Sequence, residues 1–298
     1  MNLLLTALSA RLRVTIVTAV LAVVAVVTGI ALAAATAQAS PVRAQTSAAS
    51  ARTAAAKPVI VLVHGAWADG SSWDGVISQL TRAGFTVYAP PDPLGGLSSD
   101  AAYVHDFLTG NPALAGKRVV LVGHSYGGAV ITNAAVGDPE VKALVYVDAF
   151  IPARGQTIES LLSAVPGSCI GGNPATTFDA VPYPGAPAGS ADLYLRPDKF
   201  PGCFASGLPA AEAAQLAATQ QPLAAAAVAE PSGPPAWATI PSWAVIGRQD
   251  KVIPPAELLA MAHHAGARVT EINGGHLTLI SNPRAVAAVI MRAAAAAD

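Results

Sequence analysis

The chain has 298 residues, of which 53% are hydrophobic and 12% are charged. A chain of this length can bury one large core, and α/β chains of this size commonly form a single domain. The 17 Lys and Arg residues nearly balance the 18 Asp and Glu residues, so the formal net charge is −1. This balance provides no strongly basic surface, and we therefore expect no nucleic-acid partner.

The first 39 residues have the features of an export signal. Arg11 and Arg13 precede an apolar run over residues 14–34, and Ala37-Gln38-Ala39 matches the small-x-small pattern that signal peptidases cut. We expect a signal peptide over residues 1–39, cleaved after Ala39, and a secreted protein without membrane contact. The alternative is an uncleaved N-terminal anchor, because the apolar run reaches the roughly 20 residues that span a bilayer.

Residues 40–57 are rich in Ala, Ser and Thr and show no apolar period, which predicts a flexible leader. From residue 58 onward, short apolar runs alternate with segments of helical period. The runs lie at residues 59–63, 85–88, 119–122, 143–147, 243–246 and 268–272. The helical segments lie at residues 72–83, 100–109, 127–136, 255–265 and 283–296. This alternation predicts an α/β domain over residues 58–298, with a mostly parallel sheet of about six strands flanked by helices.

The alternation stops between residues 150 and 236, where Pro, Gly and Ala are dense. This insertion follows the strand that ends near Asp148 and is too long for an ordinary loop. A long insertion in a regular scaffold is often functional, so we expect a cap over the site, with a helix over residues 209–219. Cys169 and Cys203 both lie in the cap. In an exported protein we expect them to form a disulfide, and two free buried thiols are the alternative.

The segment Gly123-His124-Ser125-Tyr126-Gly127 lies between a predicted strand and a predicted helix. This context is typical of a nucleophile elbow, in which a sharp turn forces the serine outward and leaves no room for side chains two positions away. A serine hydroxyl needs a neutral imidazole to take its proton and a carboxylate to orient that imidazole. We therefore expect Ser125 to be a catalytic nucleophile, followed in the chain by an acid and then a histidine.

His276 follows the last predicted strand, where a loop can bring its imidazole to Ser125. We expect His276 to be the base, and activity to fall as it protonates near an unperturbed pKa of about 6.5. The remaining candidates, which we interpret as surface residues on predicted helices, are His105, His263 and His264.

Two aspartates follow predicted strands and lie between Ser125 and His276. Asp250 has the expected place and order for the catalytic acid. Asp148 competes with it, but leads into the cap and can hold that junction by bonding nearby backbone. We favour Asp250.

An oxyanion formed on attack needs two preorganised N–H donors. We expect these from Tyr126, directly after the nucleophile, and from Ala66, in the loop His64-Gly65-Ala66-Trp67. His64 is interpreted as a brace for that loop. Trp67 and His124 are candidates for the substrate pocket, and Trp67 could equally pack beneath the cap. The cap aromatics, which could line the site or form the cap's own core, are Phe178, Tyr183, Tyr194, Phe200 and Phe204.

Taken together, residues 61–67, the elbow, Asp250 and His276 resemble the α/β-hydrolase superfamily, over residues 58–296. The His-Gly-Ala-Trp loop and the compact elbow are similar to the branch that holds plant methylesterases, hydroxynitrile lyases and many bacterial esterases. This resemblance implies hydrolysis of a small-molecule carboxylic ester through an acyl-enzyme, with no metal and no cofactor.

The sequence departs from the superfamily pattern in two places. The first two antiparallel strands of the superfamily are missing, which leaves about six strands. Leu277 stands where hydroxynitrile lyases of this branch carry a lysine, which disfavours lyase activity, and the serine nucleophile disfavours dehalogenase and epoxide hydrolase chemistry. The alternatives to an esterase are cofactor-free peroxidase or lyase chemistry on the same triad, or a non-catalytic binding protein of the same fold.

Overall fold

The computed structural model describes residues 56–297, which lie within one compact unit. The predicted signal peptide, residues 1–39, and residues 40–55 of the predicted leader lie outside the described residues. Within residues 56–297, none of the helices combines the length and the apolar character that a membrane span requires.

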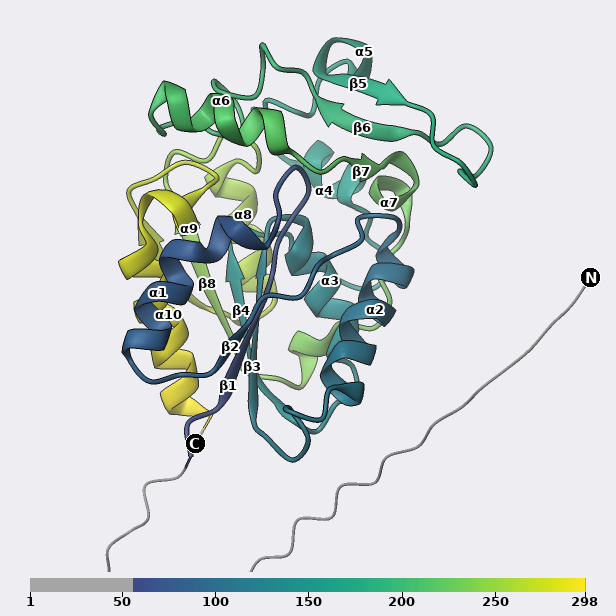
Figure 1. Ribbon diagram of the computed structural model, residues 1–298. Helices are drawn as coiled ribbons and strands as arrows, with labels where there is room; N and C mark the ends of the chain where they lie inside the picture. Colours follow the sequence, from purple (N-terminus) through teal and green to yellow (C-terminus); the bar gives the residue numbers. More distant parts are fainter. Residues whose placement is uncertain (1–55, 298) are drawn as a thin grey trace, which may run out of the picture. The chain divides into compact units, whose positions relative to one another are not determined.

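A six-stranded sheet forms the centre of the fold, in the order β2-β1-β3-β4-β8-β9 (Figure 1). Every neighbouring pair in it runs parallel. The strands are β1 (Val59–Val63), β2 (Val87–Tyr88), β3 (Val119–His124), β4 (Val141–Val147), β8 (Ser242–Gly247) and β9 (Arg268–Ile272). β1, β3 and β8 are buried along their whole length, which is why their sequences read as continuous apolar runs. The predicted α/β fold with about six strands is confirmed.

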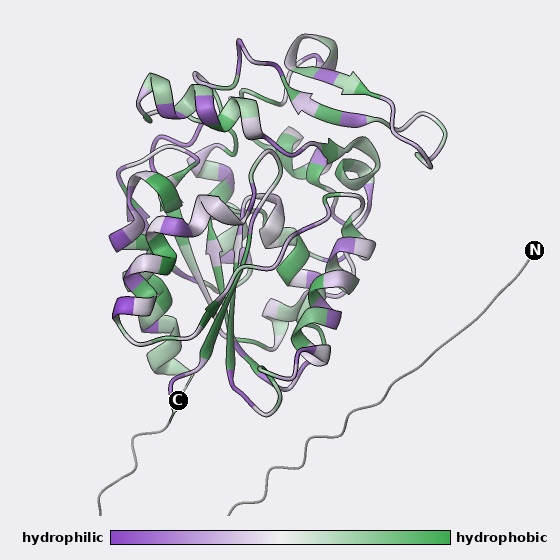
Figure 2. Ribbon diagram, in the orientation of Figure 1, coloured by the Kyte–Doolittle hydropathy of each residue, from purple (hydrophilic) through white to green (hydrophobic). Residues whose placement is uncertain are grey.

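Helices flank the sheet, with α1 and α10 side by side on one side and α2 and α3 on the other (Figure 1). Figure 2 shows hydrophobic residues along the strands and hydrophilic residues on the outer turns of these helices. In α10, the residues Val286, Val289, Ile290 and Ala293 recur at helical spacing and are fully buried. The helices and the 3-10 turn outside the cap are η1 (Gly70–Trp73), α1 (Asp74–Arg82), α2 (Leu97–Gly110), α3 (Tyr126–Ala134), α8 (Pro255–His264), α9 (Thr278–Ser281) and α10 (Pro283–Ala296).

The cap lies over the end of the sheet where β3, β4 and β8 finish (Figure 1). It contains a second, antiparallel sheet in the order β5-β6-β7, which the sequence did not predict. Its strands are only two to four residues long, too short for an apolar period to indicate them. The cap elements are α4 (Ile158–Ala164), α5 (Pro174–Thr177), β5 (Phe178–Val181), β6 (Asp192–Leu195), α6 (Ala210–Thr219), β7 (Leu223–Ala224), α7 (Ala225–Ala229) and η2 (Ala236–Ala238).

A disulfide joins Cys169 and Cys203 within the cap, with 5.8 Å between the two Cα atoms. The predicted pairing is therefore present, and the alternative of two free thiols is wrong. The bond closes a loop of 34 residues and links the segment after α4 to the segment before α6.

Candidate active site

Ser125 sits on the turn between β3 and α3 in a conformation that side chains rarely adopt. Its φ is 53° and its ψ is −123°, and such strain persists only where the surroundings enforce it. A Cβ atom on Gly123 would lie 2.4 Å from the carbonyl oxygen of Gly127, and one on Gly127 would lie 2.5 Å from that of His64. Only glycine fits at these two positions, so the turn closes tightly and presents the Ser125 hydroxyl at the end of the strand.

The Ser125 hydroxyl, the His276 imidazole and the Asp250 carboxylate form one hydrogen-bonded chain. Ser125 Oγ lies 2.9 Å from His276 Nε2, and His276 Nδ1 lies 2.8 Å from Asp250 Oδ2. The three side chains come from the turns that follow β3, β9 and β8, and parallel strands bring these turns to one edge of the sheet. With Nδ1–H donating to the carboxylate, Nε2 is free to accept the serine proton.

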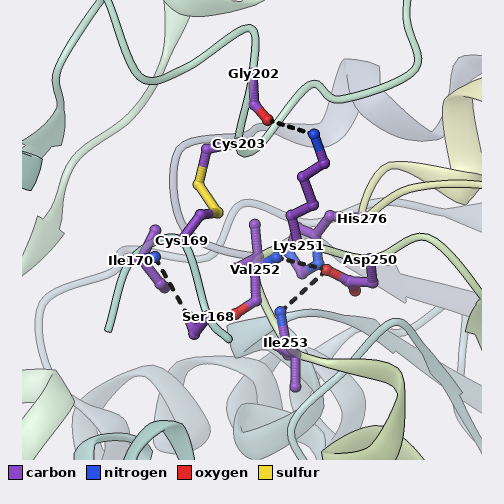
Figure 3. Close-up of a disulfide and its surroundings, with 10 residues drawn as sticks. All are labelled: Ser168, Cys169, Ile170, Gly202, Cys203, Asp250, Lys251, Val252, Ile253 and His276. Carbon is purple, nitrogen blue, oxygen red and sulfur yellow. Dashed lines mark hydrogen bonds and ion pairs between the residues drawn. A yellow bond between two sulfur atoms is a disulfide. The ribbon is translucent and has the colours of Figure 1, made fainter. Parts of the chain in front are cut away.

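Two backbone groups of its own loop hold the Asp250 carboxylate in place (Figure 3). The N–H groups of Val252 and Ile253 donate to Asp250 Oδ1 over 2.8 Å and 3.0 Å. Because Oδ1 is occupied in this way, Oδ2 is left facing His276. The loop thus fixes which carboxylate oxygen orients the imidazole.

Asp148 makes contacts of a different kind. Its Oδ1 accepts the N–H of Gly247 over 2.6 Å, and its Oδ2 accepts the Thr278 hydroxyl. Within residues 56–297 it has no hydrogen bond with His276. It therefore joins β4, β8 and α9 below the site, which is the bracing role that the sequence indicated for it.

Burial dominates the electrostatics of these groups. It lowers the pKa of His276 from its ordinary value to about 3, so the ring is held as a neutral base. Burial raises the pKa of Asp250, and the N–H donors of Ile253 and Val252 oppose that change. Burial and then the nearby charge of Asp250 raise the pKa of Asp148. Burial thus raises the pKa of both carboxyl groups of this pair.

Ala66 and Tyr126, the two expected oxyanion donors, lie beside Ser125. Within residues 56–297, the N–H groups of Ala66 and Tyr126 donate to no protein acceptor, and both residues line the same cavity as Ser125. A Cβ atom on Gly65 would lie 2.7 Å from Ser125 Cβ and 3.2 Å from Tyr126 N, which shows how closely this loop approaches the elbow. The neighbouring His64 braces the loop, since its Nε2 accepts the N–H of Asp92 over 3.0 Å.

A cavity of about 200 Å³ opens beside Ser125, between the sheet edge and the cap. Trp67 forms one wall, stacks on Phe178 at 5.5 Å between ring centroids, and donates its Nε1–H to the Leu193 carbonyl over 2.8 Å. Among the residues that the structure describes, Glu159 is the only charged one that lines the cavity. Several lining residues from the cap, which come from α4, the segment after it, β7 and α7, were indicated by no sequence pattern, namely Ile158, Leu162, Ile170, Leu223 and Val228.

The prediction that His124 lines the substrate pocket is wrong. The side chain is fully buried and is absent from the cavity wall. It turns instead into the core beside Trp73, and its Nε2–H donates to the backbone carbonyl of His276 over 3.0 Å. Of the five cap aromatics, only Phe178 lines the cavity.

A strained serine after β3, an acid after β8 and a histidine after β9, in that order along the chain, form the arrangement of an α/β hydrolase. Residues 60–289 match the sequence pattern of the Alpha/beta hydrolase family. The chain belongs to that family.

Known proteins of this family show related sequences and structures. A carbendazim hydrolyzing esterase from Nocardioides sp. is 38% identical over 133 residues, which cover 40% of this chain and 55% of that protein. The chain thus spans only about half the length of that curated relative. The crystal structure of a pyrethroid hydrolase from Sphingobium faniae has a TM-score of 0.62 at 25% identity, covering 80% of this chain and 98% of the other. An Arabidopsis methylesterase has a TM-score of 0.63 at 16% identity, covering 80% and 99%, and shows the shared fold alone.

Proposed function

We propose that this protein hydrolyses carboxylic esters of small molecules through an acyl-enzyme. In this mechanism Ser125 is the nucleophile, His276 is the general base and then the general acid, and Asp250 orients the imidazole. The N–H groups of Ala66 and Tyr126 stabilise the oxyanion.

The observation that carries this proposal is the unbroken chain from Ser125 Oγ to His276 Nε2, at 2.9 Å, and from His276 Nδ1 to Asp250 Oδ2, at 2.8 Å. Both distances are those of ordinary hydrogen bonds. Membership of the Alpha/beta hydrolase family and similarity to a carbendazim hydrolyzing esterase support the same reaction class.

The reaction follows from these contacts. Ser125 Oγ attacks the carbonyl carbon while its proton moves to His276 Nε2, and the carbonyl oxygen becomes an anion at the two N–H donors. Collapse of this intermediate breaks the bond to the alcohol, which leaves with the proton from His276. Water then repeats the sequence on the acyl-enzyme, releases the acid and restores the Ser125 hydroxyl.

The cavity indicates the kind of ester that fits. Its walls are mainly apolar, and an aromatic pair, Trp67 and Phe178, forms part of them. A neutral ester with a compact apolar group satisfies such a cavity, because no polar group is left unpaired on binding. The relatives named carbendazim hydrolyzing esterase and pyrethroid hydrolase support hydrolysis of small organic molecules at this cavity.

We further propose that the protein is exported, with residues 1–39 removed as a signal peptide after Ala39 and residues 40–57 left as a leader to the domain over residues 58–298. The disulfide between Cys169 and Cys203 supports export, because such bonds persist in oxidising compartments.

The substitution Ser125→Ala tests the mechanism. It removes the attacking oxygen, and kcat on a p-nitrophenyl ester should fall by about 10⁴ or more. In parallel, a fluorophosphonate probe should label the wild-type protein and not the variant, since only an activated serine reacts. Wild-type protein that neither hydrolyses esters nor takes up the probe would indicate a binding protein of the same fold, and a variant with unchanged turnover would contradict the role of Ser125.

A further inference from the structure

The His276 imidazole contacts two other rings in the described part of the chain. The His124 ring lies 4.8 Å away and the Phe204 ring 5.2 Å away, measured between centroids. His124 belongs to the strand that carries the nucleophile, but Phe204 comes from the cap, in the segment over residues 200–206, which we name the strap. Phe204 is buried and does not line the substrate cavity. It therefore touches the base without touching the space that the substrate would fill.

The disulfide joins the strap to the segment around Cys169, and that segment is hydrogen-bonded to the loop that carries Asp250 (Figure 3). Cys203 lies in the strap, and the N–H of its partner Cys169 donates to the Lys251 carbonyl over 2.8 Å. The Ser168 hydroxyl donates to the Val252 carbonyl over 2.6 Å. From the other side, Lys251 Nζ donates to the Gly202 carbonyl of the strap over 3.3 Å. Two segments of the cap, around Cys169 and in the strap, are thus hydrogen-bonded to the loop whose N–H groups hold the Asp250 carboxylate.

The strap also packs closely against the loop that carries His276. A Cβ atom on Gly275 would lie 2.4 Å from the carbonyl oxygen of Ser206. Such close backbone approach requires glycine at the position directly before His276. The strap therefore contacts the base loop through its backbone at Ser206 and contacts the base itself through the Phe204 ring.

We propose that Phe204 is a positioning residue for His276, and that the Cys169–Cys203 disulfide holds the strap so that Phe204 stays against the imidazole while Asp250 keeps its place. This inference rests on the proposed function of Ser125, His276 and Asp250.

A positioning residue matters here because the His276 imidazole must be held within a small range of positions and orientations. His276 must present Nε2 to Ser125 and Nδ1 to Asp250 at once, and a misplacement of about 1 Å can reduce turnover by about a hundredfold. An apolar ring against the imidazole limits its tilting and keeps water away from it. The titratable groups that face or lie near the imidazole are Asp250 and His124, with Asp148 beyond Asp250, so Phe204 supplies an uncharged face to the site.

The test compares Phe204→Leu with Phe200→Leu. Phe200 lies in the same strap, is fully buried, and packs against Phe204 with 5.0 Å between ring centroids, but within residues 56–297 its ring contacts neither His276 nor His124. Both variants lose the same atoms from the cap, so their melting temperatures should fall by similar amounts. Phe204→Leu should lower kcat by about tenfold or more with little change in KM. Phe200→Leu should keep kcat within about threefold of wild type.

A pH profile separates positioning from mere loss of stability. Burial lowers the pKa of His276, so water admitted beside the ring in Phe204→Leu should raise that pKa toward about 6.5. The acid limb of kcat/KM should then move to higher pH by about one unit or more, and the limb of Phe200→Leu should stay at the wild-type position. Equal losses of kcat in the two variants, with no movement of either limb, would overturn the proposal.

The disulfide provides a second measurement that does not depend on Phe204→Leu folding. In the folded Cys169→Ala/Cys203→Ala variant, the acid limb should move in the same direction and kcat should fall. An acid limb and kcat identical to wild type would show that the disulfide does not act on the triad. These results are distinguishable from a failure of the proposed function, because in that case the wild-type protein itself would show no esterase turnover and no fluorophosphonate labelling.

Discussion

Replacing Asp250 with asparagine tests the orientation of the base most directly. In Asp250→Asn, the amide oxygen should occupy the Oδ1 position, because the N–H groups of Val252 and Ile253 need an acceptor there. The amide nitrogen then replaces Oδ2, at 2.8 Å from His276 Nδ1. Since the amide nitrogen donates, Nδ1 must accept, and the ring proton is forced onto Nε2. His276 can then no longer take the proton of Ser125.

This change of tautomer should lower kcat by about 10⁴, which corresponds to about 5.5 kcal/mol in the activation barrier. The fold should survive, because asparagine has nearly the same shape as aspartate and keeps both backbone hydrogen bonds. The measurement is the initial rate of p-nitrophenyl ester hydrolysis at saturating substrate, with a circular dichroism melt of the same sample to establish that it is folded.

Asp148→Asn is the matched control, because it places the same substitution on the neighbouring buried carboxyl. Its Oδ1 still accepts from Gly247, and its amide donates to the Thr278 hydroxyl, which also has lone pairs to accept with. We expect kcat within about tenfold of wild type. If Asp250→Asn kept kcat within tenfold while Asp148→Asn lost it, the acid would be Asp148 and the assignment above would be refuted.

Two further predictions concern pH and substrate charge. Because burial lowers the pKa of His276, the imidazole stays neutral as pH falls below about 6.5. The acid limb of kcat/KM should therefore lie well below the pH at which an exposed histidine titrates. An acid limb at pH 6.5 or above, in a profile measured with a neutral ester, would contradict this prediction. Within residues 56–297, Glu159 is the only charged residue on the cavity wall. Glu159→Gln should therefore raise kcat/KM by about threefold for an ester that carries a carboxylate, such as monoethyl succinate, and leave ethyl butyrate unchanged. Equal effects on both esters would show that the carboxylate of Glu159 does not face the substrate.

The residues of the proposed triad could be predicted from the sequence because each stands beside a strongly patterned element. Ser125 follows the apolar run of β3, and the glycines at 123 and 127 fill positions where a Cβ atom would meet backbone at 2.4 Å and 2.5 Å. Asp250 and His276 follow the runs of β8 and β9. In a parallel sheet the ends of the strands meet at one edge, so chain order alone indicates which side chains can converge.

The cap could not be predicted in the same way, because its contacts are irregular and non-local. Phe204 and Phe178 look alike in the sequence, yet Phe178 lines the cavity and Phe204 packs on His276. His124 was expected at the pocket, but the tight turn points it and its neighbour Ser125 in different directions and buries the histidine. The lowered pKa of His276 was missed for the same reason, since it depends on how completely the cap excludes water from a residue that the sequence places on a loop.

The cap contacts the loops that carry three of the four parts of the proposed catalytic site, namely the oxyanion donor Ala66, the acid Asp250 and the base His276. It bonds the oxyanion loop through Trp67, whose N–H donates to the Gln221 carbonyl over 2.8 Å and whose Nε1–H donates to Leu193. It reaches the acid loop through Ser168 and Cys169, and the base loop through the strap. The nucleophile is held by the tight packing of its own elbow against the sheet.

The separation between the residues that line the cavity and those that contact the triad has a consequence for changing the specificity of the proposed esterase. The residues of α4 line the cavity, and within residues 56–297 their side chains share no hydrogen bond or ring contact with Ser125, His276 or Asp250, so substitutions there can alter which ester fits while the reaction geometry is kept. The strap contacts the triad without lining the cavity, so substitutions there should alter turnover for every ester alike. Exchange of the whole cap would change both properties together, because the polypeptide that selects the substrate also holds the base and the acid in place.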